Sequence, residues 1–185
     1  MRRTSPAKLI VGGIAALLAS LLAVHKIPHG GSYSKTTAAV QHSEIHHVVY
    51  VYDGDTIKLN DGERVRLIGI DTPESRQNDK LEHDVRRLHK DKQTLLSMGH
   101  QASVFTKDLL QGKDVRLELD VEPRDRYGRL LAYVYLTDGT FVNEKIIRQG
   151  YAYPLTIPPD VRYADKFKQW FDEARENNRG LWRKI

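Results

Sequence analysis

Three short segments of the chain combine carboxylates and arginines in an order that suits phosphate chemistry. They are Asp53–Thr56 (DGDT), Arg66–Glu74 (RLIGIDTPE) and Asp125–Arg129 (DRYGR). Each segment lies at the end of a predicted strand or in a turn, where a rigid strand can hold charged side chains in place. Carboxylates in such positions can bind a hard divalent cation, and guanidinium groups can bind an anion.

Asp55 and Asp71 are candidate metal ligands, with water and backbone carbonyls completing the coordination shell. Zinc is not expected, because the chain has no cysteine and its eight histidines show neither HExxH nor HxH spacing. The alternative for the segment around Asp53 and Asp55 is a solvated turn, since so short a pattern is weak evidence on its own.

Arg66 and Arg129 are candidates for binding a phosphate. Arg66 shares strand parity with Ile68 and Ile70, so it is expected on an otherwise apolar face, where it must find an anionic partner. That partner is either a ligand or a protein carboxylate in a structural salt bridge. Arg129 ends a tight turn at Tyr127-Gly128.

Glu74 follows Asp71-Thr72-Pro73 at the exit of a predicted strand. From that position it could take a proton from water or orient the water toward phosphorus. Two arginines and a divalent cation are the groups that neutralise a phosphoryl transition state.

The elements that must position these residues are predicted from periodicity and turn signals. Five strands, rich in β-branched and aromatic residues, are expected at His47–Tyr52, Thr56–Leu59, Arg64–Ile70, Val115–Asp120 and Leu130–Leu136. Three helices with apolar faces are expected at Gln101–Gln111, Val142–Gln149 and Tyr163–Asn178. Several connections are too short for parallel crossovers, so the pattern favours a small barrel that carries helices.

The net charge of +5 is concentrated at the N-terminus and gives no argument for a polyanionic partner. Residues 1–45 hold five basic residues and one acid, so residues 46–185 carry 24 basic and 23 acidic residues. The globular part is therefore nearly neutral, and any binding of nucleic acid depends on where individual charges lie.

The N-terminal residues 1–24 are interpreted as a signal peptide or a membrane anchor, because a basic cluster precedes the uncharged run Leu9–Val24. Leu21 is too large for the position two residues before Ala23 in a cleavage site, which favours an uncleaved anchor. The basic N-terminus then stays in the cytoplasm, and the rest of the chain lies outside it; cleavage would instead give a secreted protein. A buried core helix is a third interpretation, and it is not favoured because a polar linker follows at residues 25–45.

Together the charged segments resemble the thermonuclease (staphylococcal nuclease-like) family over residues 46–185. The matching strings are DGDT, the arginine five residues before DTPE, GHQASVF, RYGR followed by LAYVY, VNE, RQG and GLW. The resemblance implies an α+β, mainly β fold: an OB-fold five-stranded barrel with about three helices. It also implies hydrolysis of DNA and RNA with little sequence preference. A monomer is expected.

The resemblance implies a role for each matching residue. Asp55 and Asp71 match the calcium carboxylates of the family, and Thr72 matches the residue that offers its backbone carbonyl to Ca²⁺. Asp53 matches an acidic residue near the metal.

The remaining matches concern the phosphate and the water. Glu74 matches the acidic residue that activates or positions the attacking water, and Arg66 and Arg129 match the two arginines that bind and stabilise the phosphate. An alternative is a non-catalytic module on the same barrel, which binds nucleic acid or protein. Loss of any of these three residues would favour that alternative, and all three are present.

Two features depart from the family pattern. The connection Ser75–Met98 is longer than usual, and the spacing of Leu81, Val85 and Leu88 predicts a short amphipathic helix within it. Six basic residues of this connection are offset by four acids, so it is either a solvated helix with internal ion pairs or a lid whose cations contact the substrate backbone. The second departure is the spacing of Tyr151 and Tyr153, which are candidates either for stacking on bases or for the core.

Overall fold

The structure, a computed structural model, describes residues 44–183. Its strands are β1 (Ile45–Asp53), β2 (Thr56–Leu59), β3 (Arg64–Leu67), β4 (Ile70–Asp71), β5 (Asp114–Glu118), β6 (Leu130–Leu136) and β7 (Tyr153–Pro154). Its helices are α1 (Asp79–Leu88), α2 (Lys92–Leu110), α3 (Val142–Arg148), α4 (Ala164–Glu176) and the 3₁₀ helix η1 (Gly180–Trp182). The predicted anchor and linker lie outside the described residues, and no helix within 44–183 is long and apolar enough to cross a bilayer.

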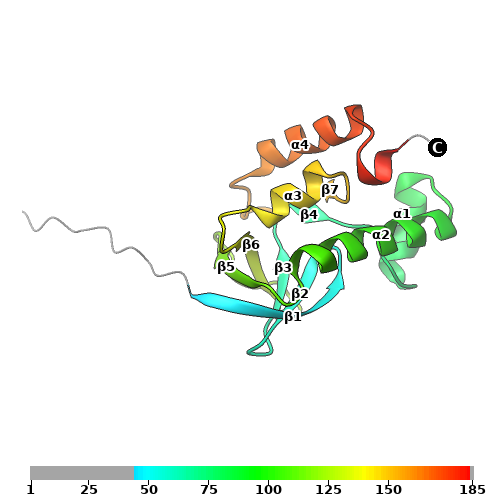
Figure 1. Cartoon of the computed structure of the whole chain (residues 1–185). Helices are drawn as coiled ribbons and strands as arrows, with labels where there is room; N and C mark the ends of the chain where they lie inside the picture. Colours follow the sequence, from blue (N-terminus) through cyan, green and yellow to red (C-terminus); the bar gives the residue numbers. More distant parts are fainter. Residues whose placement is uncertain (1–43, 184–185) are drawn as a thin grey trace, which may run out of the picture. The chain divides into compact units, whose positions relative to one another are not determined.

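Five strands close into a barrel in the order β1-β2-β3-β6-β5, as Figure 1 shows. All neighbours are antiparallel except β3 and β6, which run parallel and pair Arg66 with Leu131. This parallel pair closes the barrel and brings the end of β3 beside the start of β6. The expected five-stranded OB-type barrel is confirmed, and it carries four α-helices instead of about three.

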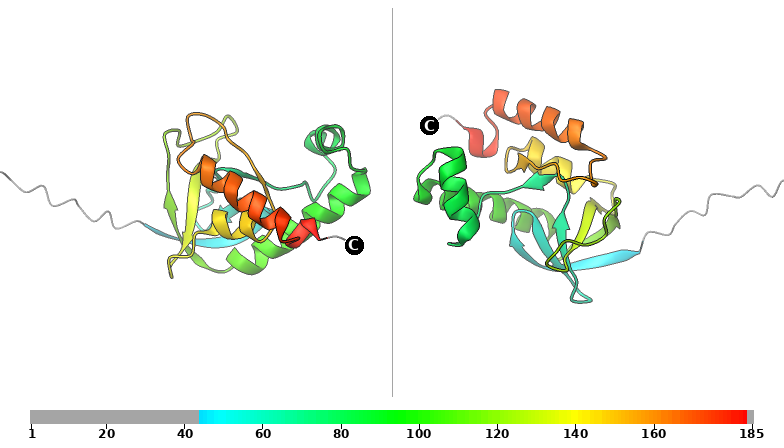
Figure 2. Two further views of the ribbon diagram at one scale, coloured as in Figure 1. Left: turned by 90° about the horizontal axis from the view of Figure 1, so that it is seen from above. Right: turned by 180° about the vertical axis from the view of Figure 1, so that it is seen from behind.

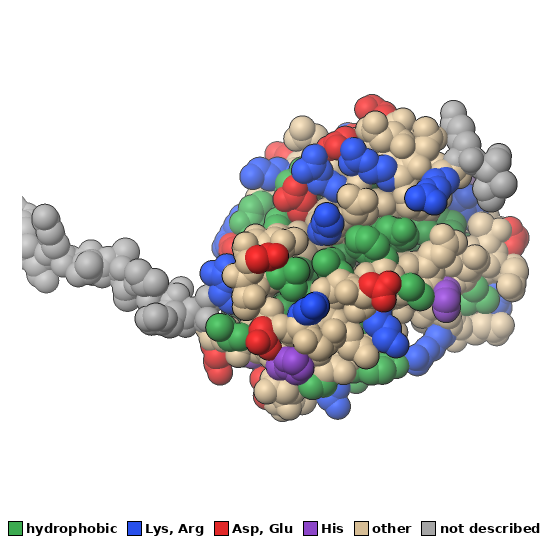
Figure 3. Space-filling view, viewed as in Figure 1, with side chains coloured by type: hydrophobic (Ala, Val, Ile, Leu, Met, Phe, Trp, Pro, Cys, Tyr) green, Lys and Arg blue, Asp and Glu red, His purple; other side chains and the backbone are tan. Residues whose placement is uncertain are grey.

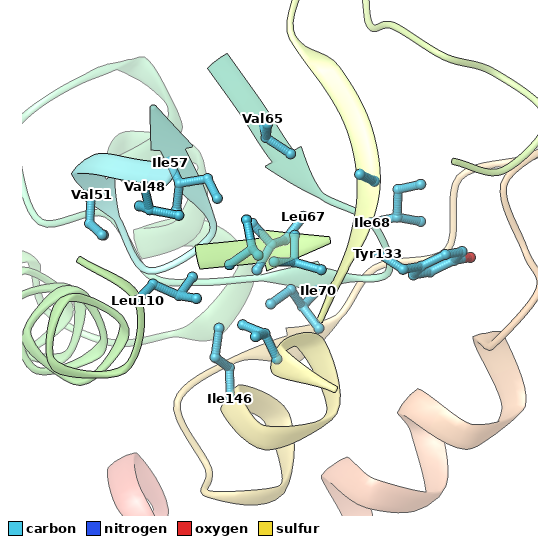
Figure 4. Packing of buried hydrophobic residues seen from close by; sticks show 14 of the residues in the cluster. Val48, Val51, Ile57, Val65, Leu67, Ile68, Ile70, Leu110, Tyr133 and Ile146 are labelled. Carbon is cyan, nitrogen blue, oxygen red and sulfur yellow. The ribbon is translucent and has the colours of Figure 1, made fainter. Parts of the chain in front are cut away.

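The core fills the barrel and the space between the barrel and the helices (Figure 4). Val48, Ile57 and Leu67 point inward from three strands, and Leu110 of α2 and Ile146 of α3 pack against them. These five side chains are at most 1% exposed. Burying each of them contributes about 1.5–3 kcal/mol relative to leaving it in water, so this core holds the strands in register.

The predicted strand Arg64–Ile70 is interrupted at Gly69. Gly69 has a φ of 82°, and an added Cβ there would lie 2.0 Å from the ring of Phe167 on α4. The backbone therefore turns after β3, and the next two residues form β4, which pairs with β7. The prediction of one unbroken strand over Arg64–Ile70 was therefore wrong, although Arg66, Ile68 and Ile70 line the same cleft.

Helix α1 and the first turns of α2 form an arm that projects beside the barrel, as Figure 2 shows, while the C-terminal half of α2 packs on the barrel. The predicted short helix in Ser75–Met98 is confirmed as α1, whose first turn is capped by Asn78. Helix α2 begins at Lys92, not at the predicted Gln101, and Asp91 caps it through a 2.8 Å bond from the Thr94 amide. A small second core joins the two helices: Leu81, Leu95 and Met98 are its buried members.

Charged side chains are mixed in sign on the face drawn in Figure 3, where Lys and Arg alternate with Asp and Glu. This mixture agrees with the nearly equal numbers of acids and bases expected for residues 46–185. The charges that could act together must therefore be sought in a particular cleft.

Candidate active site

A cleft with a volume of about 590 Å³ lies beside β3, between the turn after β1 and the turn that precedes β6. Five of the six residues expected in the site line this cleft: Arg66, Glu74, Arg129, Asp55 and Asp71. The sixth, Thr72, is 2% exposed and lies behind the carboxylates. Residues that are far apart in the sequence are thus brought to one place by the closure of the barrel.

Asp55 is fixed by hydrogen bonds before any ligand arrives. Its Oδ2 accepts the Thr72 amide at 2.8 Å and the Thr72 hydroxyl at 3.1 Å, and its Oδ1 accepts the Thr56 hydroxyl at 3.1 Å. Only glycine fits at position 54, because a Cβ there would lie 2.5 Å from the Thr72 methyl group. Thr106 of α2 holds the same turn by donating to the Gly54 carbonyl at 2.9 Å.

Asp71 occupies β4, which is held from two sides. The buried Asn143 of α3 donates to the carbonyl of Ile68 at 2.8 Å and accepts the amide of Val134 at 2.9 Å. The pairing of Asp71 with Tyr153 in β7 fixes the other side. The carboxylate is therefore positioned by elements far along the chain.

Arg66 finds its anionic partners within the protein. One guanidinium nitrogen lies 2.7 Å from Asp55 Oδ2, and the other donates to Asp71 Oδ1 at 3.2 Å. Burial alone would lower the pKa of Arg66, but the charges of Asp55 and Asp71 outweigh burial and raise it above its usual value. The nitrogen that faces Asp55 makes a close ionic contact without the alignment of a hydrogen bond, so part of its donor capacity is unused.

The carboxylates of the cleft differ in protonation. Burial and the nearby charge of Asp55 raise the pKa of Asp53 to about 7. Burial would raise the pKa of Asp55 as well, but Arg66 and Lys80 hold it below its usual value. Asp55 is therefore more strongly ionised than Asp53 at neutral pH and the better ligand for a cation.

Lys80 of α1 is a member of the site that the sequence interpretation did not assign. Its ammonium nitrogen lies 3.0 Å from Asp71 Oδ1, 2.9 Å from the Thr72 carbonyl oxygen and 2.7 Å from Glu74 Oε1. It thus contacts both Asp71 and the Thr72 carbonyl, which were expected to bind a metal. The spacing of Lys80, Asp84 and Arg87 puts them on one helix face, but it does not indicate that this face meets the cleft.

Glu74 is held at the mouth of the cleft by two partners. Asn78 donates to its Oε2 at 2.6 Å, and Lys80 donates to its Oε1 at 2.7 Å. Helix α2 packs directly on the backbone of Glu74, since a Cβ on Gly99 would lie 2.1 Å from the Glu74 carbonyl oxygen. The close approach of a helix backbone sets the position of this carboxylate.

Arg129 reaches the cleft from the turn before β6. Asp125 accepts the Arg129 side chain at 2.7 Å and its amide at 3.0 Å, and Gly128 allows the turn with a φ of 77°. The guanidinium also donates to the Thr56 hydroxyl at 3.3 Å, which in turn donates to Asp55. A chain of polar contacts therefore connects Arg129 to the carboxylates.

Tyrosines divide between the cleft and the core. Tyr127 lines the cleft with 66% of its surface exposed, and Arg126 and Arg129 lie 4.8 Å and 5.6 Å from its ring centre. Tyr151 stacks on Phe105 at 4.3 Å, and Tyr153 packs against aromatic rings of α4 and η1. Of the two alternatives for Tyr151 and Tyr153, the structure places both in packed surroundings.

The donor set suits a hard cation, although it is not made of side chains alone. Within residues 44–183, no three His, Cys, Asp or Glu side chains converge closely enough to hold a metal. The oxygens of Asp71, Thr72 and Glu74 nevertheless surround one ammonium group, which shows that they can coordinate a positive charge. All are hard oxygen donors, the class that Ca²⁺ prefers.

Comparison with known proteins agrees with this architecture. The family described as staphylococcal nuclease homologue matches residues 64–184. The chain is similar to a thermonuclease of Staphylococcus intermedius, with 36% identity over 95% of this chain and 98% of that protein. A thermonuclease of Staphylococcus hyicus is 31% identical over the same shares. Endonuclease YncB of Bacillus subtilis is 34% identical over 71% of this chain and 58% of its own length.

The matched region contains the strand of Arg66, the carboxylates of Asp71 and Glu74, and the turn of Arg129. The two thermonucleases extend the similarity to nearly the full chain. This chain therefore belongs to the staphylococcal nuclease family.

Proposed function

We propose that the protein is a calcium-dependent nuclease that hydrolyses phosphodiester bonds in DNA and RNA with little sequence preference. The observation that carries the proposal is the convergence of Arg66, Arg129 and Glu74 on one cleft that also holds Asp55 and Asp71. The relatives named thermonuclease and endonuclease support the same reaction class.

The two arginines serve as the phosphate-binding groups. Arg66 comes from β3 and Arg129 from the turn before the adjacent strand β6, so both are attached to the barrel. Their guanidinium groups can donate to phosphate oxygens in pairs and stabilise the charge that develops there. Because Arg66 is already held by Asp55 and Asp71, little reorganisation is needed when the phosphate binds.

Glu74 acts on the water. Its carboxylate lines the cleft, and a carboxylate in this position can accept a proton from water as the water attacks phosphorus. Asp55, Asp71 and the carbonyl of Thr72 would hold Ca²⁺, which supplies a positive charge for the phosphate oxygens when it is bound.

Low sequence preference is consistent with the composition of the cleft. Arg66 and Arg129 address a phosphate, which every nucleotide carries. Tyr127 presents an exposed ring, and stacking on a ring tolerates any base. A site of this kind binds the sugar-phosphate backbone of the substrate and makes few contacts that depend on the identity of a base.

Hydrolysis assays with metal-free protein test the proposal. Single-stranded DNA, duplex DNA and RNA are incubated with protein stripped of metal, with Ca²⁺ or Mg²⁺ added back, and with excess chelator. We expect cleavage of all three substrates in Ca²⁺, loss of cleavage in chelator, and less cleavage in Mg²⁺ because Mg²⁺ demands stricter geometry.

Two results would contradict the proposal in different ways. Full activity of the stripped protein in chelator would rule out the dependence on calcium. Absence of cleavage under every metal condition, with a cooperatively folded protein, would favour the non-catalytic module on the same barrel.

A further inference from the structure

We infer that Lys80 is an internal competitor for the cation site, so that a bound cation must displace its ammonium group and loosen helix α1. The inference extends the proposed function, because it concerns the cation that the carboxylates of the cleft would hold. It arises from the contacts of α1, which the proposed reaction does not use.

The ammonium group of Lys80 occupies the space that a cation needs. Its distances of 2.9 Å to the Thr72 carbonyl and 3.0 Å to Asp71 Oδ1 are longer than Ca²⁺–oxygen bonds of about 2.3–2.6 Å, but they place the ammonium nitrogen against two of the three groups that would hold Ca²⁺. Both positive charges cannot occupy this small volume, because they would repel each other strongly at such a distance. Binding of a cation therefore requires the lysine to leave.

Lys80 can leave, whereas the other cation of the site cannot. Arg66 lies on β3 with its side chain 12% exposed, between two carboxylates. The Lys80 side chain is 36% exposed and has a flexible four-carbon stem, so its ammonium group can move to solvent. The competition is thus expected at Lys80 and not at Arg66.

Helix α1 depends on the same carboxylate through a second contact. Arg87 lies 3.4 Å from Asp71 Oδ2 and 2.7 Å from the buried Asp84 of its own helix. A cation on Asp71 would weaken the contacts of both Lys80 and Arg87. Because coupling between two binding events is reciprocal, docking of α1 must lower the affinity for the cation as much as the cation loosens α1.

Calorimetric titration with Ca²⁺ tests the inference on the full folded protein. Lys80→Met removes the charge and keeps much of the side-chain volume, and we expect its dissociation constant for Ca²⁺ to fall about tenfold. Lys80→Arg retains the positive charge and is expected to stay close to the wild-type affinity. Lys92→Met is the matched control, because Lys92 lies nearby in the chain and pairs with the exposed Glu82.

Hydrogen exchange gives a second readout that does not depend on activity. We expect Ca²⁺ to accelerate exchange of the α1 amides in the wild type while the amides of β2 and β3 stay protected. In Lys80→Met the change on adding Ca²⁺ should be smaller, because one of the two contacts with Asp71 is already absent.

The outcomes separate this inference from the proposed function. Wild-type affinity for Ca²⁺ in Lys80→Met, in a protein that cleaves DNA only with Ca²⁺, overturns the competition and leaves the nuclease proposal standing. An equal gain of affinity in Lys92→Met overturns it as well, because general charge would then explain the effect. Absence of any Ca²⁺ binding, in wild type and variant alike, contradicts both proposals.

Discussion

The barrel and the α1 arm both contribute charged groups to the cleft, yet they are anchored very differently. Asp55, Asp71 and Arg66 rest on the main core, whose members come from the barrel strands and from helices α2, α3 and α4. Lys80 and Arg87 rest on a second core with three fully or nearly buried residues, joined only by partly buried neighbours. The groups that the barrel contributes are thus supported by a large core, and the groups that α1 contributes are supported by a small one.

The difference in core size separates two requirements of the site: some groups must keep their geometry, and others must move when a cation enters. The groups that must keep their geometry during reaction are attached to the barrel, where movement would disturb many packed side chains. The groups that must move when a cation enters are attached to a helix with few buried contacts, which can open without unfolding the barrel. Three experiments test this division, beginning with the largest expected effect.

Glu74→Gln is expected to lower turnover by about 10²–10³ while the protein remains folded, because it removes one charged group from a preorganised site. Glu74 lies at the boundary between the two regions, with its backbone against α2 and its carboxylate paired with Lys80. Initial rates on single-stranded DNA in saturating Ca²⁺ measure the effect. Glu176→Gln on the exposed side of α4 is the control.

Near-native turnover of Glu74→Gln would remove Glu74 from the reaction and leave the arginines as the main catalytic groups. A circular dichroism melt of each variant shows whether a loss of rate reflects a loss of fold.

Leu110→Ala and Leu95→Ala compare the two cores within one helix. Both leucines belong to α2 and are 0% exposed, but Leu110 lies in the main core and Leu95 in the small one. Leu110→Ala is expected to lower the free energy of unfolding by about 2–5 kcal/mol, the usual range for a buried leucine. Leu95→Ala should act mainly on the α1 arm.

Urea unfolding and hydrogen exchange measure this difference. In Leu95→Ala we expect the α1 amides to exchange faster while the amides of β2 and β3 keep their protection. If both variants reduced protection of the barrel equally, the two cores would form one cooperative unit and the division would be wrong.

The smallest expected effect concerns the exposed cations of the arm. Among the described residues, Arg86 and Lys90 form no ion pair, whereas Arg87 and Lys92 are paired with acids. The solvated-helix interpretation therefore fits Arg87 and Lys92, and the substrate-contact interpretation applies to Arg86 and Lys90. If these two residues contact the backbone, the double variant to glutamine should reduce the salt slope of binding to long single-stranded DNA by about 1.4.

Glu74→Gln protein, whose turnover is expected to be lowered, serves as the background for this binding measurement. Lys166→Gln with Arg175→Gln removes two exposed charges from α4 and is the matched control. An unchanged slope in the Arg86 and Lys90 variant would leave the arm without a role in holding substrate.

Local patterns in the sequence predicted the barrel strands well, because β-branched residues and turn signals are properties of short segments. They failed where a distant residue decides the conformation. The break at Gly69 is set by Phe167, which lies on the last long helix. The early start of α2 had a local signal that was not used, since Leu95 and Met98 continue the apolar stripe of Ala102.

For the candidate site too, local properties could be predicted from the sequence, and positions set by distant contacts could not. The need of Arg66 for an anionic partner could be predicted from its chemistry, although the predicted strand around it was longer than the observed one. Lys80 could not be placed, because its contacts depend on how α1 packs against α2 through the small second core. No short pattern in the sequence specifies how an amphipathic helix is oriented relative to a cleft.

The pairing of β4 with β7 has a consequence for the protein during its synthesis. Asp71 is held by Tyr153, and the carbonyl of Ile68 is held by Asn143, 75 residues later in the chain. A growing chain that has not yet reached β7 contains Asp55, Arg66, Glu74 and Arg129 but cannot fix Asp71 among them. The cleft should therefore be completed only when translation has nearly finished, because its last supporting strand is among the last elements to be synthesised.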